Sequence, residues 1–249
     1  MASLDILIGC ESFKKIREYN CCYDDKTSFL IEMLSSQAPS VSLITRPRRF
    51  GKTLMLSMLH EFFDIRNDSR NLFKYLAITK HDNICKRCMN KNPTIFFSLM
   101  RVEWSDFVAA MRTFRDLAAR ICEENKYLLE SDKVSQLDRE ILYHVMVRKA
   151  DPTEFSGFLY NLCYALESYW GRQAILLIDE YDVPISYAEQ NGYYDKMISF
   201  MRDMLGTALK TNSSLEFAIL TGCLRIAKES IFTGINNFMC YSVSNEKIC

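Results

Sequence analysis

The chain has 249 residues, enough for a domain with a well-filled core, and its 49% hydrophobic and 25% charged residues are typical of a globular protein. Lysine plus arginine and aspartate plus glutamate both number 31, so the overall charge does not indicate nucleic acid as a partner. No apolar run reaches the roughly 18 residues that a membrane span needs, and residues 1–10 lack the basic start of a signal peptide. We therefore expect a cytoplasmic protein without a membrane partner.

Residues 1–40 are expected to form a helical segment ahead of the first strand. A helix over about residues 11–20 is followed by a second helix with apolar residues on one face: Phe29, Leu30, Met33 and Leu34. Residues 37–40 form a loop, and the apolar residues Val41–Thr45 predict a strand.

A tight loop follows this strand, and Gly51-Lys52-Thr53 then opens an amphipathic helix. This order is typical of a phosphate-binding loop, in which backbone N–H groups and the helix N-terminus hold a triphosphate. Lys52 would reach the β- and γ-phosphates, and the Thr53 hydroxyl would be a ligand of Mg²⁺. The pattern has glycine at its first position, where this chain has arginine. The residues expected to bind ATP are Arg46, Pro47, Arg48, Arg49, Phe50, Gly51, Lys52 and Thr53.

Helix and strand patterns alternate over the next hundred residues. The helix after the loop carries a stripe that predicts packing against a sheet: Met55, Met58, Leu59 and Phe62. A second strand is expected at Thr94–Met100, followed by a helix that Ser105 caps and that runs past Ile121. Residues 124–150 are charged and mostly helical. Asp151, Pro152 and Glu154 supply three start signals of a further helix, which continues to Gly171.

Ten cysteines are present. Four of them sit in apolar patterns and are expected to be buried free thiols: Cys122, Cys163, Cys223 and Cys240. Cys85 and Cys88 have the spacing of half a zinc knuckle, but no second pair of ligands follows. We therefore expect them to be two free thiols on a loop.

A second motif lies more than a hundred residues after the phosphate loop. Ala174–Glu180 is a continuous apolar run that ends in two carboxylates, as expected for a buried strand of a parallel sheet. At the ligand-binding edge of such a sheet, Asp179 would hold Mg²⁺ and Glu180 would polarise the attacking water.

The remaining patterns complete an α/β fold. Pro184 is expected in a loop, a helix follows over about residues 197–208, and strands are expected at Leu215–Leu220 and Phe238–Val243. Strands joined by long helical connections predict a mainly parallel sheet with helices on both faces, in a single domain over residues 1–249. A strand and two helices separate the phosphate-loop helix from the carboxylate strand, which is typical of the ASCE type of P-loop NTPase.

Two further positions are candidates for the same site. Thr221, at the tip of a strand, lies where such enzymes have a polar sensor of the γ-phosphate or of the attacking water; a simple strand-end residue is the alternative. Arg225 follows and would neutralise charge on the transferred phosphoryl group. An ordinary solvated helix face, which would also include Lys228, is the alternative for Arg225.

Thr79-Lys80-His81-Asp82 matches the guanine-reading tetrad of GTPases. It precedes the Asp179 strand, whereas that tetrad follows the corresponding strand in GTPases. The order favours coincidence, and ATP is the predicted nucleotide.

Several blocks resemble the AAA-ATPase-like domain of bacterial proteins that often carry a C-terminal PD-(D/E)XK nuclease-like domain. The blocks are Tyr23–Thr27, Ile44–Thr53, Leu177–Ile185 and Leu220–Phe232, and the resemblance covers about residues 11–243. It implies an ASCE-type P-loop fold and ATP binding, and it accounts for the arginine at the start of the loop. The chain stops soon after the last predicted strand, so we expect neither the nuclease-like domain nor a helical lid.

The sequence leaves three functions open. The first is an ATPase or ATP-dependent switch that uses Mg²⁺. The second is a nucleotide-responsive binding module with little hydrolysis, and the third is a fragment that needs a C-terminal effector. A protein partner or a second copy of the chain is compatible with each, but the sequence identifies neither.

Overall fold

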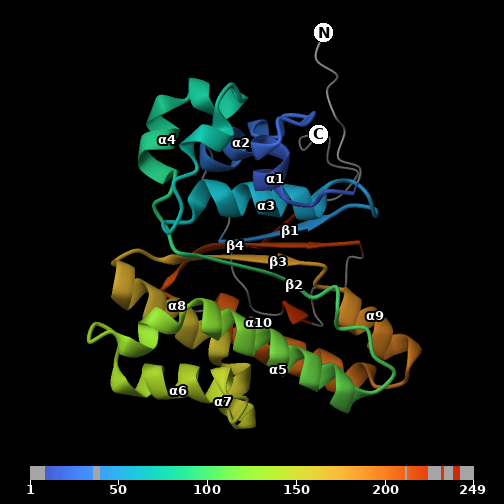
Figure 1. Cartoon of the computed structure of the whole chain (residues 1–249). Helices are drawn as coiled ribbons and strands as arrows, with labels where there is room; N and C mark the ends of the chain where they lie inside the picture. Colours follow the sequence, from blue (N-terminus) through green and yellow to red (C-terminus); the bar gives the residue numbers. More distant parts are fainter. Residues whose placement is uncertain (1–8, 36–39, 211, 224–230, 233–237, 242–249) are drawn as a thin grey trace.

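The computed structural model describes residues 9–35, 40–210, 212–223, 231–232 and 238–241 (Figure 1). Within these residues one five-stranded sheet has the order β2-β3-β4-β1-β5. Every neighbouring pair of strands is parallel. The strands are β1 (Val41–Thr45), β2 (Thr94–Ser98), β3 (Ala174–Asp179), β4 (Leu215–Gly222) and β5 (Phe238–Tyr241).

The middle of the sheet is covered on both faces, as its sequence predicts. All residues of β1 and β3 are buried. Continuous apolar runs such as Ala174–Ile178 have no polar face to turn to water, so helices must lie on either side. The predicted α/β fold with a parallel sheet and helices on both faces is therefore confirmed. β4 separates β1 from β3, which is the strand insertion of the ASCE type of P-loop fold.

The N-terminal helices cover one face of the sheet (Figure 1). The ring of Phe62 makes edge-on contacts with the rings of Phe63 and Phe73 in this layer. The layer closes over Ile175, Leu177 and Ile219 of the sheet. The elements of the layer are α1 (Phe13–Glu18), α2 (Ser28–Ser35), α3 (Lys52–Phe63), α4 (Asp82–Cys88) and the 3₁₀ turns η1 (Arg70–Phe73) and η2 (Ala77–Lys80). The predicted stripe of Met55, Met58, Leu59 and Phe62 lies in this core.

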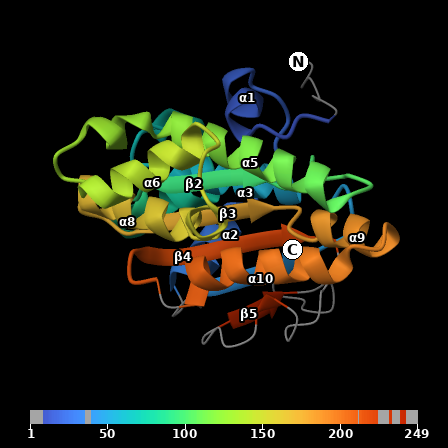
Figure 2. The ribbon, with the colours of Figure 1, turned by 90° about the horizontal axis from the view of Figure 1, so that it is seen from below.

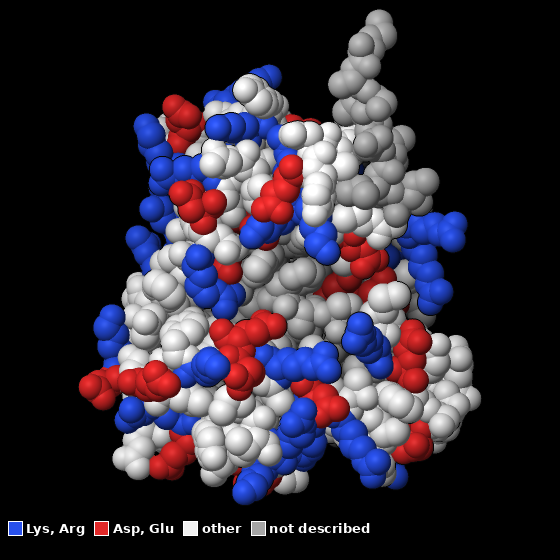
Figure 3. All heavy atoms as spheres, in the orientation of Figure 1, with Lys and Arg blue, Asp and Glu red and all other residues white. Residues whose placement is uncertain are grey.

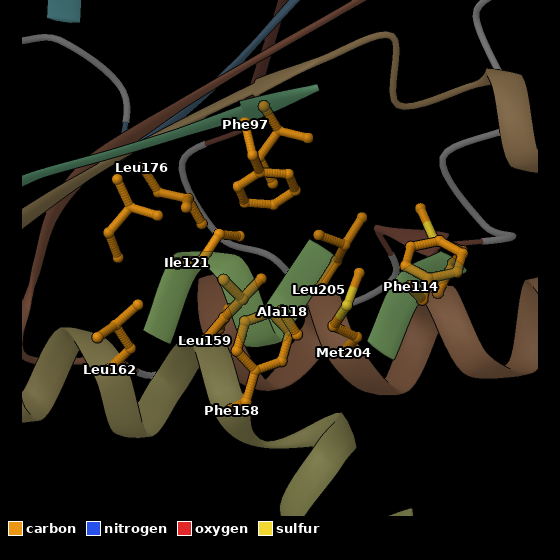
Figure 4. Close-up of a cluster of buried hydrophobic side chains, with 14 of the residues drawn as sticks. Phe97, Phe114, Ala118, Ile121, Phe158, Leu159, Leu162, Leu176, Met204 and Leu205 are labelled. Carbon is orange, nitrogen blue, oxygen red and sulfur yellow. The ribbon is translucent and has the colours of Figure 1, made fainter. Parts of the chain in front are cut away.

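The longer helices cover the opposite face (Figures 1 and 2). Phe97 and Leu176 of the strands face Ile121, Leu159 and Leu205 of three different helices (Figure 4). The elements are α5 (Phe107–Glu124), η3 (Lys126–Glu130), α6 (Gln136–Met146), α7 (Pro152–Ser156), α8 (Phe158–Trp170), α9 (Val183–Gln190) and α10 (Tyr194–Lys210).

Several predicted boundaries are wrong by a few residues. β2 ends at Ser98 rather than at Met100. Asp106, not Ser105, caps α5, and its carboxylate accepts a hydrogen bond from the N–H of Ala109 at 2.9 Å. Both residue types are good caps, so the sequence alone does not choose between neighbours.

The helix predicted from Asp151 to Gly171 is two helices. The capping box of Asp151 and Glu154 starts α7 as expected, but the helix ends at Ser156 and α8 begins at Phe158. Gly157, a weak helix former, provides the break. The turn there lets the rings of Phe155 and Phe158 stack with 5.9 Å between centroids.

Pro184 lies in a helix rather than in the predicted loop. It occupies the first turn of α9, where the missing N–H costs no intrahelical hydrogen bond. The last strand is described to Tyr241; residues 242 and 243 of the prediction lie outside the described residues.

The structure places three pairs of cysteines for which the sequence makes predictions. Cys122 and Cys163 are buried, and burial raises the pKa of each thiol to about 12. Cys223 and Cys240 are only partly buried, so the prediction of burial is wrong for these two. Cys85 and Cys88 lie on α4 rather than on a loop. That they hold no structural zinc stays a prediction.

Candidate functional site

Three loops meet at the carboxyl edge of the sheet, where β1, β3 and β4 end. Thr45 of β1 is paired with Gly222 of β4, and Ile178 of β3 with Leu220 of β4. The N–H of Arg46 donates to the carbonyl of Gly222 at 3.1 Å, which ties the first residue after β1 to the end of β4. Because parallel strands end at one edge, the loops after these strands form one site.

The loop at 46–51 turns the chain from β1 into α3. Arg49 and Gly51 have left-handed backbones, with φ of 68° and 72°. Gly51 is the residue before the helix and caps it with no side-chain hydrogen bond. The N–H groups of the first turn of α3 therefore point out of the helix without a capping side chain, which makes this end suited to an anion.

Asp179 is the centre of the polar contacts at this edge. Its residue is 1% exposed, at the end of β3. The Thr53 hydroxyl donates to Oδ2 at 2.7 Å, and the Thr221 hydroxyl donates to Oδ1. The structure therefore brings together Thr53, Asp179 and Thr221, which are far apart in the sequence.

The oxygen atoms of Thr53 and Asp179 suit a hard cation. Within the described ranges, no group of three or more His, Cys, Asp or Glu residues forms a metal-binding cluster. A cation at Asp179 would therefore take most of its ligands from phosphate and water, as Mg²⁺ ordinarily does. The residues present fit Mg²⁺ bound together with a nucleotide better than a metal held by protein ligands alone.

Lys52 is buried and folded back onto the loop. Its Nζ donates to the carbonyls of Arg46 at 3.1 Å and Pro47 at 3.3 Å. Its ammonium also lies 3.6 Å from Oε1 of Glu180. In this arrangement the lysine neutralises the glutamate and occupies acceptors of its own loop.

Glu180 directly follows β3 with a left-handed backbone, φ 52°. This conformation is costly for a residue with a Cβ, and such residues concentrate at functional sites. Burial raises the pKa of Glu180, against the lowering effect of Lys52, and the nearby Asp179 and Asp182 raise the pKa further. The carboxylate thus has a stronger tendency to take up a proton than an exposed glutamate.

Two further hydrogen bonds fix the residues that follow β3 to the end of β4. The N–H of Tyr181 donates to the carbonyl of Thr221 at 3.0 Å, and the N–H of Cys223 donates to Oδ2 of Asp182 at 3.0 Å. A Cβ on Gly222 would lie 2.7 Å from a ring atom of the buried Tyr181. Only glycine allows this approach.

Asp182 and Cys223 lie at the site, although the sequence does not predict them as site residues. Cys223 Sγ lies 3.4 Å from Lys52 Nζ and 3.9 Å from Glu180 Oε2. The signal for Asp182 is its carboxylate, three residues after the end of β3 and within the block Leu177–Ile185. No local pattern distinguishes Cys223 from a core cysteine.

The other predicted residues are placed as follows. Pro47, Arg48, Arg49 and Phe50 are exposed at the rim of the loop, with Phe50 57% exposed. Arg225 and Lys228 lie outside the described residues. The Thr79–Asp82 tetrad lies in η2 and at the start of α4.

Comparison of the chain with known proteins gives three findings. Residues 7–232 match the model of the AAA-ATPase-like family, described as a predicted AAA-ATPase. The chain is similar to an uncharacterized protein in the vnfD 5' region of Azotobacter chroococcum mcd 1, with 25% identity over 247 residues. That similarity covers 98% of this chain and 42% of the relative, so the chain spans about two fifths of the length of the curated relative. No solved structure matches the chain significantly.

The apolar character of the helices and the charges on one face of the molecule describe what the chain presents to its surroundings. Among the helices of the described residues, none combines the length and the apolar character that crossing a bilayer requires. On the face in Figure 3, lysine and arginine are interspersed with aspartate and glutamate.

Proposed function

The chain belongs to the AAA-ATPase-like family, and on this premise we propose that it binds ATP with Mg²⁺ and hydrolyses the γ-phosphate. The observation that carries the proposal is the hydrogen bond of 2.7 Å between Thr53 and Asp179. This bond joins the first turn of α3, the helix that follows β1, to the end of β3. In the sheet β4 lies between β1 and β3, so the bond connects residues from non-neighbouring strands.

In this proposal the loop 46–53 binds the phosphates. The free N–H groups at the start of α3 hold phosphate oxygens, and Lys52 turns away from Glu180 toward the β- and γ-phosphates. Thr53 and Asp179 would hold Mg²⁺, which would supply positive charge against the phosphates. The exposed Arg48 and Arg49 are close enough in sequence for at least one to add charge to this cradle.

Glu180 and Thr221 serve the attacking water in this proposal. Once Lys52 leaves it, Glu180 would accept the proton of the water that attacks phosphorus. Burial and the neighbouring carboxylates raise its pKa, which makes it a stronger base than an exposed glutamate and supports this role. The hydrogen bond to Asp179 would keep the Thr221 hydroxyl in position near the attacking water. Arg225 would neutralise the negative charge that develops on the transferred phosphoryl group.

One observation favours the alternative of a nucleotide-responsive module. The Lys52–Glu180 ion pair of 3.6 Å keeps both side chains from their roles until a ligand separates them. A protein in which ATP only breaks this pair and reshapes the loops would signal without turnover. A fragment that needs an effector domain is equally compatible with a relative of which the chain covers 42%.

The test of nucleotide binding is calorimetric titration of the chain with ATP and Mg²⁺. Lys52→Ala removes the buried cation of the loop, and we expect its affinity for ATP to fall at least a hundredfold, because several charged hydrogen bonds to phosphate are lost. The matched control is Lys14→Ala, an exposed lysine of α1. Equal affinities of Lys52→Ala and wild type would show that the phosphate site is elsewhere.

A further inference from the structure

Lys26 lies against the phosphate loop although it belongs to the segment between α1 and α2. Its Nζ is 3.5 Å from the position that a Cβ of Gly51 would take. Gly51 has a left-handed backbone and directly precedes α3, which begins at Lys52. A half-buried ammonium group from the N-terminal segment is therefore in contact with the end of the helix that would receive phosphate.

The residues on both sides of Lys26 are fixed to the neighbouring turn η2. Asp25 accepts hydrogen bonds from the N–H of Thr27 at 2.9 Å and from the N–H of Ala77 at 2.6 Å. The Thr27 hydroxyl donates to Asp25 at 2.7 Å and accepts from the N–H of Ile78 at 3.1 Å. The backbone of Lys26 is thereby anchored beside the loop, and only its side chain needs to adjust to a ligand.

This placement is electrostatically unfavourable without an anion. The N-terminus of a helix carries a partial positive charge, and the charge of Lys52 at this loop is already paired with Glu180. Within the described residues Lys26 forms no ion pair, whereas Lys52 has Glu180. A cation held by anchored neighbours at a positive helix end indicates that a negative ligand completes the arrangement.

We propose that Lys26 is a second phosphate-binding cation of the nucleotide site, supplied by the N-terminal segment and not by the loop itself. The inference rests on the proposed function, because it assigns Lys26 to the same bound nucleotide. The ammonium reaches the phosphates from the Gly51 side, while Lys52 reaches them from within the loop. The role is one of binding, so it acts on affinity for the phosphate chain.

The test compares Lys26→Met, Lys26→Arg and the control Lys14→Met in titrations with ATP and with AMP, at low and high salt. For Lys26→Met we expect ATP to bind about tenfold more weakly, the loss of one charge-assisted phosphate contact. We expect a smaller change for AMP, and a shallower dependence of ATP affinity on salt. Lys26→Arg keeps the charge and most of the affinity, and Lys14→Met behaves as wild type.

The unfolding temperature of the ligand-free protein distinguishes a binding role of Lys26 from a structural role. We expect Lys26→Met to unfold at the same temperature as wild type or higher, since a cation leaves a positive helix end. If wild type binds ATP and Lys26→Met binds it equally well, the inference is wrong and the proposed function stands. If Lys26→Met loses affinity and stability together and Lys26→Arg does not restore them, Lys26 is structural. If wild type does not bind ATP, the proposed function fails, and the inference with it.

Discussion

Glu180 combines a left-handed backbone, a raised pKa and an ion pair to Lys52 in one residue. Glu180→Gln keeps the size of the side chain but removes the base. We expect ATP turnover to fall about a hundredfold or more, the scale for loss of a general base. Affinity for ATP should stay equal or increase, because Lys52 no longer has to leave a carboxylate. Steady-state hydrolysis and calorimetric titration measure the two quantities.

The matched control for this change is Glu189→Gln, at an exposed position of α9. A Glu180→Gln protein that hydrolyses ATP as fast as wild type would contradict the role of Glu180. Absence of turnover in wild type, with ATP binding intact, would favour the nucleotide-responsive module over the enzyme.

Asp179 accepts from two hydroxyl groups at once, those of Thr53 and Thr221. In Asp179→Asn the amide has one acceptor oxygen and no charge, so it cannot keep both contacts or neutralise a divalent cation. We expect Mg²⁺ to strengthen ATP binding by wild type and to have little effect on the variant. ATP titrations with Mg²⁺ and with EDTA test this. The control Asp203→Asn changes an exposed carboxylate of α10, and an unchanged Mg²⁺ effect in Asp179→Asn would exclude Asp179 as a metal ligand.

The start of α7 shows how a short element depends on its first residues. Asp151 accepts from the N–H of Thr153 at 2.7 Å and of Glu154 at 2.9 Å, and Glu154 accepts in return from the N–H of Asp151 at 3.0 Å. Asp151→Ala leaves two N–H groups without these acceptors. We expect a loss of about 1 kcal/mol in the free energy of unfolding.

Chemical denaturation of wild type, Asp151→Ala and Thr153→Ala measures this loss. Thr153→Ala is the control, because Thr153 contributes only its backbone N–H to the cap. An Asp151→Ala protein as stable as wild type would mean that solvent replaces the cap without cost.

The elements that the sequence predicts well are those whose signal is local. β1, the phosphate loop and α3 follow from a run of adjacent residues, and the capping box at Asp151 is a four-residue pattern. The break at Gly157 has only a weak local signal, because a single glycine inside a helical pattern is tolerated. The stacking that accompanies the break is not local: Phe155 contacts Phe158 and also Phe200, whose ring is 5.6 Å away on α10.

The same distinction applies to the candidate site. Thr53 and Asp179 were predicted together because each belongs to a recognisable motif. Lys26 lies in the block Tyr23–Thr27, but no pattern in that block places it at the phosphate loop. Its approach to Gly51 joins residues 25 positions apart, through the anchoring of Asp25 and Thr27 to η2. Cys223 approaches Lys52 only because β4 lies beside β1. Such contacts follow from the order of the strands, which local patterns do not give.

At the scale of the molecule, one sheet serves two hydrophobic cores. Along β3, Leu176 and Ile178 belong to the core under the long helices, while Ile175 and Leu177 belong to the core under α3. Unfolding either layer therefore exposes residues that hold the other. We expect a single cooperative unfolding transition of the chain.

Binding of ATP at the carboxyl edge of this sheet should raise the midpoint temperature of the whole unfolding transition. ATP with Mg²⁺ at a hundred times its dissociation constant stabilises by about 2.7 kcal/mol, which corresponds to a rise of about 5–10 °C for a chain of this size. Differential scanning calorimetry at several ATP concentrations measures the rise, and Lys52→Ala should show almost none. Two transitions, of which ATP shifts only one, would contradict the coupling through β3, since the layer under α3 would then unfold independently of the layer under the long helices.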